Sequence, residues 1–256
     1  MDRIKSVFKN KDRNILISYI TAGDPNAEKT FYFVLGMEAA GADIVEIGFP
    51  YKDSPADGNV IQKAVTRALN NDMDVEKCFE LIKKLRNHTE IPLVGLIYYN
   101  QIFCYGEKLF LEMCDKVGLD GLVIPDMPIE DKKKWLEKYE FNVKLIPMIA
   151  PTSYDRIDDI LKVGDGFVYC VSNKGVTGTK KTFDPMLNKI VKKIKKISDI
   201  PVAIGFGISD KETANKMWDI GDAVIIGSAI VNCIEEGIVD SSELQRVSAF
   251  IGNLKL

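Results

Sequence analysis

The sequence predicts an α/β protein that folds as a (β/α)8 barrel, the TIM-barrel architecture, with an extra N-terminal helix. Eight short apolar runs recur along the chain, and each is followed by an amphipathic helical pattern. The 256 residues contain no Pro/Gly/Ser-rich linker that would divide them. Alternating strands and helices form right-handed parallel units, and eight such units in about 250 residues match a closed barrel. We therefore expect one domain over residues 1–256, with an open doubly wound sheet as the alternative.

The expected strands lack strict polar alternation, which indicates that both of their faces are buried. They cover residues 14–20, 42–47, 91–99, 120–125, 142–149, 166–171, 200–205 and 222–227. The expected helices cover 26–40, 59–70, 74–87, 106–117, 129–139, 153–163, 184–197, 209–219, 228–236 and 241–254. The extra helix is expected at the N-terminus, where Ile4, Val7 and Phe8 have helical spacing.

Composition excludes several classes of protein. The net charge is −3, so no basic field favours nucleic acid or an anionic membrane, and no apolar run is long enough to span a bilayer. The N-terminus lacks an apolar signal core. Five scattered cysteines without a C-x-x-C pair indicate a reducing cytoplasm and predict neither a disulfide framework nor a metal site. The single histidine, His88, lies at the polar end of an expected helix, so histidine chemistry is not expected.

Two carboxylates stand out in the stretch DIVEIGFPYKDSPADGN, residues 43–59. Glu46 lies at the end of an expected strand, on the same side as Ile44, and barrel active sites lie at these strand ends. Burial there would raise its pKa and suit it to proton transfer; the alternative is a structural acid with a lysine or amide partner. Asp57 follows in the loop. It is either a turn or helix N-cap, or the second member of an acid–base pair.

Glycine-bearing loops follow the last three expected strands. GFGIS (205–209) and IIGSAIV (225–231) stand where barrels often bind phosphate, because glycine permits close approach and a helix N-terminus attracts anions. The loop NKGVTGTKK (173–181) is long and polar, as expected of a lid, and lacks the P-loop spacing. The alternative for the two shorter loops is tight strand-to-helix turns.

Aromatic residues gather at or just beyond strand ends. They predict a ligand with a flat apolar group at one end and a phosphate at the other, although ordinary core packing is the alternative for about half of them. These residues are Tyr19, Tyr98, Tyr99, Phe103, Tyr169 and Phe206.

The motifs VEIGFPYKDSPADG, YCVSNKGVTG, GFGIS and IIGSAIV, in this order, resemble the tryptophan synthase alpha subunit family. SYITAGDP and GLVIPDMPIED extend the resemblance over nearly the whole chain. It implies a (β/α)8 barrel that cleaves indole-3-glycerol phosphate to indole and glyceraldehyde 3-phosphate without a cofactor of its own. It also implies an α2β2 complex, in which the beta subunit uses pyridoxal phosphate to make tryptophan from indole.

The resemblance implies roles for individual residues. Glu46 matches the catalytic glutamate, and Asp57 matches the aspartate that binds the indole N–H. Asp53 and Asp126 match positions tied to communication between subunits. The implied substrate-binding positions are Tyr19, Tyr98, Tyr169, Thr177, Gly178, Phe206, Gly207, Gly227 and Ser228.

The loop after the second strand departs from the family pattern F/Y-S-D-P-x-A-D-G-P. Here it reads Y-K-D-S-P-A-D-G-N: Ser54 replaces a proline, and Pro55 follows one position later. Tyr19 also stands where the family usually has Phe. These departures bear on loop stiffness and on subunit communication more than on the chemistry. Three other functions are considered: a stand-alone lyase, another phosphate-binding barrel enzyme, and a catalytically silent barrel that activates a partner.

Overall fold

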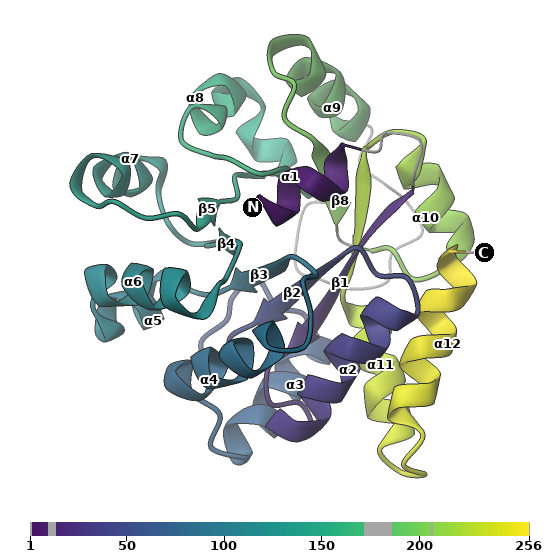
Figure 1. Ribbon diagram of the computed structural model, residues 1–256. Coiled ribbons are helices and arrows are strands. Elements are labelled where there is room, and N and C mark those ends of the chain that lie inside the picture. The colour runs from purple at the N-terminus through teal and green to yellow at the C-terminus, as the bar shows by residue number, and fades with distance from the viewer. Residues whose placement is uncertain (1, 10–13, 172–185, 206, 256) are drawn as a thin grey trace.

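The computed structural model describes residues 2–9, 14–171, 186–205 and 207–255. Over these residues helices surround a central ring of strands (Figure 1). The strands are β1 (Ile15–Thr21), β2 (Ile44–Gly48), β3 (Leu93–Leu96), β4 (Gly121–Val123), β5 (Lys144–Leu145), β6 (Met148–Ile149), β7 (Val168–Val171), β8 (Val202–Gly205) and β9 (Ala223–Ile226).

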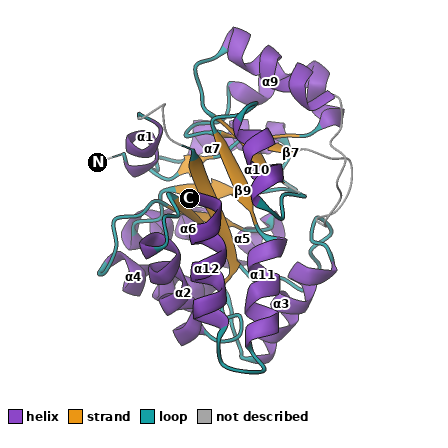
Figure 2. Cartoon of the chain, turned by 90° about the vertical axis from the view of Figure 1, so that its right-hand side faces the viewer, coloured by secondary structure: helices purple, strands orange, loops and turns teal. Residues whose placement is uncertain are grey.

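The helices other than α1 cover the outside of this ring, as the side view shows (Figure 2). They are α1 (Arg3–Phe8), α2 (Ala27–Ala39), α3 (Asn59–Asn70), α4 (Val75–Arg86), α5 (Tyr99–Tyr105), α6 (Glu107–Val117), α7 (Ile129–Lys138), α8 (Ile157–Leu161), α9 (Met186–Ile197), α10 (Lys211–Trp218), α11 (Ser228–Gly237) and α12 (Glu243–Lys255), with the 3-10 helix η1 (Pro151–Arg156) before α8.

The strands form one parallel sheet in the order β5-β4-β3-β2-β1-β9-β8-β7-β6. Its two end strands, β5 and β6, are consecutive pieces of the single strand expected at 142–149. Ile146 N donates to Leu122 O at 2.8 Å on one side, and Tyr169 N donates to Pro147 O at 2.8 Å on the other. Pro147 has no N–H to donate, which interrupts the strand without separating its halves. The chain itself therefore joins the two ends of the sheet, and the predicted barrel is confirmed.

One helix was not predicted. Residues 91–99 look like one strand, but β3 ends at Leu96 and α5 begins at Tyr99. The Tyr99 N–H donates to the Asp126 carboxylate at 2.8 Å, which satisfies an amide at the new helix start. Gly106, at a φ of 95°, ends the helix. The predicted helix at 153–163 is also divided, into η1 and α8.

The extra N-terminal helix α1 closes the amino end of the barrel. Ile4 and Phe8 are buried there among inward-facing residues of the strands. The rings of Phe8 and Phe167 lie 5.9 Å apart, and Arg3 pairs with Asp120 at 3.1 Å just before β4. With this end filled, the opposite end, where the strands finish, is the one left for a ligand.

Candidate active site

Glu46 lies in the middle of β2, opposite Tyr19 on β1 and Val94 on β3. Two residues earlier on the same face, Ile44 belongs to the barrel interior, so Glu46 caps that interior at the carboxyl end of the sheet. The side chain is 2% exposed, and its Oε1 has no hydrogen-bond partner among the described residues. Burial, reinforced by the charge of Asp57, raises the pKa of Glu46 to about 8.

Asp57 lies in the loop between β2 and α3. Burial raises the pKa of its carboxyl to about 6, and the nearby Ser54 hydroxyl opposes the shift, although Ser54 Oγ forms no hydrogen bond of normal geometry among the described residues. Gly58, rather than Asp57, is the N-cap of α3, and no side chain caps this helix. The N-cap alternative for Asp57 is therefore wrong. Burial therefore favours the protonated form of both groups, and it favours that of Glu46 more strongly.

Three of the aromatic residues line the pocket that contains the two carboxylates: Tyr19, Tyr98 and Tyr169. The hydroxyl groups of Tyr19 and Thr21 lie 3.1 Å apart. Tyr98 accepts a hydrogen bond from Ala56 N at 3.2 Å, which ties the Asp57 loop to the wall of the pocket.

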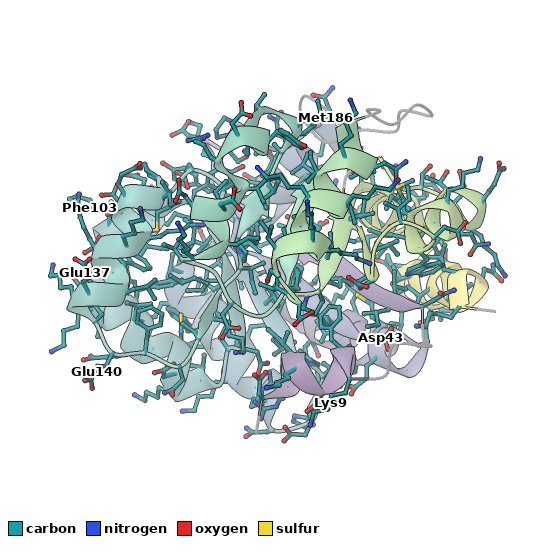
Figure 3. All side chains as sticks on the ribbon, turned by 90° about the horizontal axis from the view of Figure 1, so that it is seen from above. Lys9, Asp43, Phe103, Glu137, Glu140 and Met186 are labelled. Carbon is teal, nitrogen blue, oxygen red and sulfur yellow. The ribbon has the colours of Figure 1, made fainter. Side chains whose placement is uncertain are left out.

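The other aromatic residues are placed differently. Tyr99 begins α5 and does not line the pocket. Phe103 is 66% exposed and projects from the outer edge of the molecule (Figure 3). Phe206 lies outside the described residues. Tyr19, Tyr98 and Tyr169 are buried in the core and also line the pocket, whereas Phe103 is neither packed in the core nor part of the pocket.

Sequence reasoning missed two glycines that give the phenols room. A Cβ on Gly48 would lie 2.3 Å from the Tyr19 hydroxyl, and a Cβ on Gly205 would lie 2.7 Å from the Tyr169 ring. Gly48 directly follows Ile47 at the end of β2, and Gly205 ends β8. A glycine inside a strand often marks such a close approach, so the glycine of VEIG could have predicted that another group packs against this strand end.

The two shorter glycine loops meet at the same pocket, as predicted. Gly207, Gly227 and Ser228 line it, and α11 begins at Ser228 with its free N–H groups at this end. Thr177, Gly178 and the loop 173–181 lie outside the described residues.

The pocket has an apolar lining with few polar groups. Its empty volume, counted out to the open mouth, is about 710 Å³. The remaining walls are formed by Ala56, Ile61, Leu96, Pro125, Met148, Ile208, Ile225 and Ala229. An acid–base pair at one wall and helix-start amides at another suit a ligand with an apolar body and an anionic end.

Asp53 and Asp126 do not join the acid pair. Both are exposed on loops at the mouth, and Asp126 accepts the Tyr99 N–H.

His88 is an exposed residue after α4, with Nδ1 3.0 Å from Lys84 O, as expected for a surface histidine. Within the described residues, no three His, Cys, Asp or Glu side chains are placed to hold a metal ion. No helix in that part of the chain is long and apolar enough to cross a membrane.

These features define the class of protein: a (β/α)8 barrel with two carboxylates in an apolar pocket at the carboxyl ends of its strands. Comparison with known families gives the particular one. The family model of the tryptophan synthase alpha chain matches residues 6–255. The chain is 48% identical over 248 residues to the alpha chain of Alkaliphilus metalliredigens, covering 96% of this chain and 93% of the relative. It is 45% identical to that of a Thermoanaerobacter species, over 100% and 98% of the two chains.

Solved structures agree with this result. A structure of Mycobacterium tuberculosis tryptophan synthase matches with a TM-score of 0.89 at 29% identity, over 99% of this chain and 97% of that one. The tryptophan synthase A-subunit of Pyrococcus furiosus matches with a TM-score of 0.86 at 32% identity, over 94% and 97%.

The chain belongs to the tryptophan synthase alpha chain family. It is a carbon–carbon lyase of tryptophan biosynthesis, and its reaction is the cleavage of indole-3-glycerol phosphate to indole and glyceraldehyde 3-phosphate. The resemblance drawn from the sequence is thereby confirmed. In this family the alpha chain partners with a beta subunit, to which indole is passed.

Proposed function

We propose that Glu46 carries both proton transfers of this cleavage. The reaction breaks the bond between indole C3 and the first glycerol carbon, so a proton must reach C3 and another must leave the hydroxyl on that carbon. A carboxylic acid that is protonated at neutral pH donates the first proton, and the carboxylate so formed accepts the second. The breaking bond's electron pair restores the indole ring, and the hydroxyl carbon becomes the aldehyde.

Asp57 is the second group in this proposal. Protonation at C3 places positive charge on the indole nitrogen, and an ionised carboxylate near the N–H stabilises that charge. The difference between the two pKa values, about 8 for Glu46 and about 6 for Asp57, supports this division of roles. The observation that carries the assignment is that Glu46, buried with Oε1 unpaired among the described residues, lines the same pocket as Asp57.

The phosphate end of the substrate is assigned to the part of the wall that Gly207, Gly227 and Ser228 form. The amides at the start of α11 offer donors and a favourable dipole there. Tyr19, Tyr98 and Tyr169 then lie beside the indole. Thr177, Gly178 and Phe206 remain proposed substrate-binding positions on the strength of the resemblance alone.

The remaining proposals concern the domain organisation, the partner, the cellular compartment and the cofactor of the enzyme. We propose that the chain works as one barrel domain in an α2β2 complex, in the cytoplasm, with Asp53 and Asp126 on the side of the beta subunit. The exposed rim positions of these two residues and the free cysteines support this view. The cleavage requires only proton transfer and charge stabilisation, so we propose no cofactor for this chain. We assign pyridoxal phosphate to the beta partner.

The test is indole release measured with and without a saturating beta subunit. The wild-type chain is expected to release indole slowly alone and faster with beta, while Glu46→Gln and Asp57→Asn lose activity in both conditions. Equal rates for wild type with and without beta would favour the stand-alone lyase. Near-normal release by Glu46→Gln would show that Glu46 is structural.

A further inference from the structure

A second pocket lies beside the active site, between the start of α7 and η1. It shares two wall residues, Pro125 and Met148, with the active-site pocket, and its empty volume, counted in the same way, is about 770 Å³. Lys132 and Arg156 line it from its two sides. Neither residue has a part in the cleavage proposed above.

The Lys132 side chain is mostly buried, and its ammonium faces the pocket without a partner among the described residues. It belongs to the first turn of α7 and is 8% exposed, whereas its neighbours Lys133 and Lys134 are exposed. Within the described residues its ammonium makes neither a hydrogen bond nor an ion pair, and the nearby Asp131 is paired with Lys134 at 2.8 Å. Burial lowers the pKa of Lys132 to about 8, opposed by the charge of Asp126. The stem of the side chain is covered, and the unpaired ammonium reaches the open space of the pocket.

The pocket carries more positive than negative charge. Arg156, at the end of η1, is exposed and makes no hydrogen bond or ion pair in the described part of the chain, and the hydroxyl of Ser153 lies in the same lining. The one carboxylate of the lining, Asp126, already accepts the Tyr99 N–H. The lining therefore holds two cations and one carboxylate, which leaves one positive charge without a counter-charge in the lining.

We propose that this pocket is a second anion-binding site, which holds a small phosphate monoester or carboxylate between Lys132 and Arg156. The anion supplies the partner that Lys132 lacks and offsets the excess charge of the lining. This inference goes beyond the cleavage reaction and does not depend on the roles given to Glu46 and Asp57.

The test is calorimetric titration of the full chain with inorganic phosphate and, separately, with acetate. Phosphate is expected to bind wild type at two sites, the active-site pocket and the second pocket. Lys132→Met retains the length of the side chain and removes the charge, and should weaken the second site at least about tenfold, as the loss of a charge-assisted hydrogen bond implies. Lys133→Met removes the same charge from an exposed position of the same helix and should change binding less than about twofold.

The two titrants separate the two classes of ligand. Saturable binding of phosphate that Lys132→Met removes and Lys133→Met does not identifies a phosphate site, and the same result with acetate only identifies a carboxylate site. A single binding event in wild type with both titrants, or equal losses in the Lys132→Met and Lys133→Met variants, would overturn the proposal.

A second variant and a second measurement distinguish the loss of the anion site from misfolding of the Lys132→Met variant. Arg156→Gln changes an exposed side chain and should weaken the same binding event several-fold. Without added anion, Lys132→Met should unfold at nearly the same urea concentration as wild type, because Lys132 makes no hydrogen bond or ion pair with another described residue. Unchanged anion binding in both Lys132→Met and Arg156→Gln would contradict the site.

Discussion

Glu46→Gln should make the protein more stable and less active, and the gain in stability should depend on pH. The folded protein raises the pKa of Glu46 from 4.5 to about 8. A carboxyl whose pKa is higher in the folded state holds its proton more tightly there, so it lowers stability as pH rises from about 4.5 to about 8. At about 1.4 kcal/mol per pKa unit, the pKa difference of about 3.5 corresponds to about 5 kcal/mol once the group is ionised.

Glutamine has the shape of the protonated acid and cannot ionise. The free energy of unfolding of Glu46→Gln should therefore lie within about 1 kcal/mol of wild type at pH 5, and exceed it by about 3 kcal/mol at pH 7 and about 5 kcal/mol at pH 9. Indole release should fall by at least roughly 10²-fold, as for a lost general acid–base group.

Urea unfolding of both proteins at the three pH values measures this effect. Glu137→Gln, which changes an exposed glutamate at the outer edge of α7 (Figure 3), is the matched control and should follow wild type within about 0.5 kcal/mol. If Glu46→Gln and wild type lose or gain stability in parallel over this pH range, ionisation of Glu46 is not costly, and the argument from burial is refuted.

Three further substitutions test the walls of the pocket. Gly48→Ala should displace the Tyr19 phenol and lower kcat by about 10- to 100-fold, measured by steady-state indole release. Tyr98→Phe removes the hydrogen bond from Ala56 N and should lower kcat/KM by about 2- to 10-fold; an unchanged value would show that this bond does not hold the loop. Gly227→Val should mainly raise KM, because a side chain blocks the approach of the phosphate; equal binding of glycerol phosphate to this variant and wild type would move the site elsewhere.

The repeating pattern of strand and helix sufficed to predict the barrel, because strands buried on both faces leave uninterrupted apolar runs. It did not predict α5. The residues around Tyr98 and Tyr99 favour a strand. The helix begins there because the Tyr99 N–H finds an acceptor in Asp126, which lies 27 residues further along the chain. The break between β5 and β6 depends on Pro147, whose effect was visible only once its neighbours in the sheet were known.

Site residues were predicted where their residue type is unusual for its surroundings in the sequence or matches a family pattern. A carboxylate inside an apolar strand identified Glu46, and the family pattern identified Asp57, for which local spacing also allowed an N-cap. Spacing along the chain did not reveal that Gly48 must leave space for Tyr19, since that contact joins two strands. Nor did it reveal that Lys132, one of three consecutive lysines, is the buried one.

A 13C NMR titration of glutamate carboxyl groups tests the central claim, that Glu46 is a protonated acid at neutral pH, most directly. The spectrum of Glu46→Gln assigns the Glu46 signal by its absence. The account predicts that this signal titrates near pH 8, well above the ordinary value of 4.5. A midpoint below about pH 5 would mean that Glu46 is ionised in the resting enzyme and cannot be the acid that protonates indole C3.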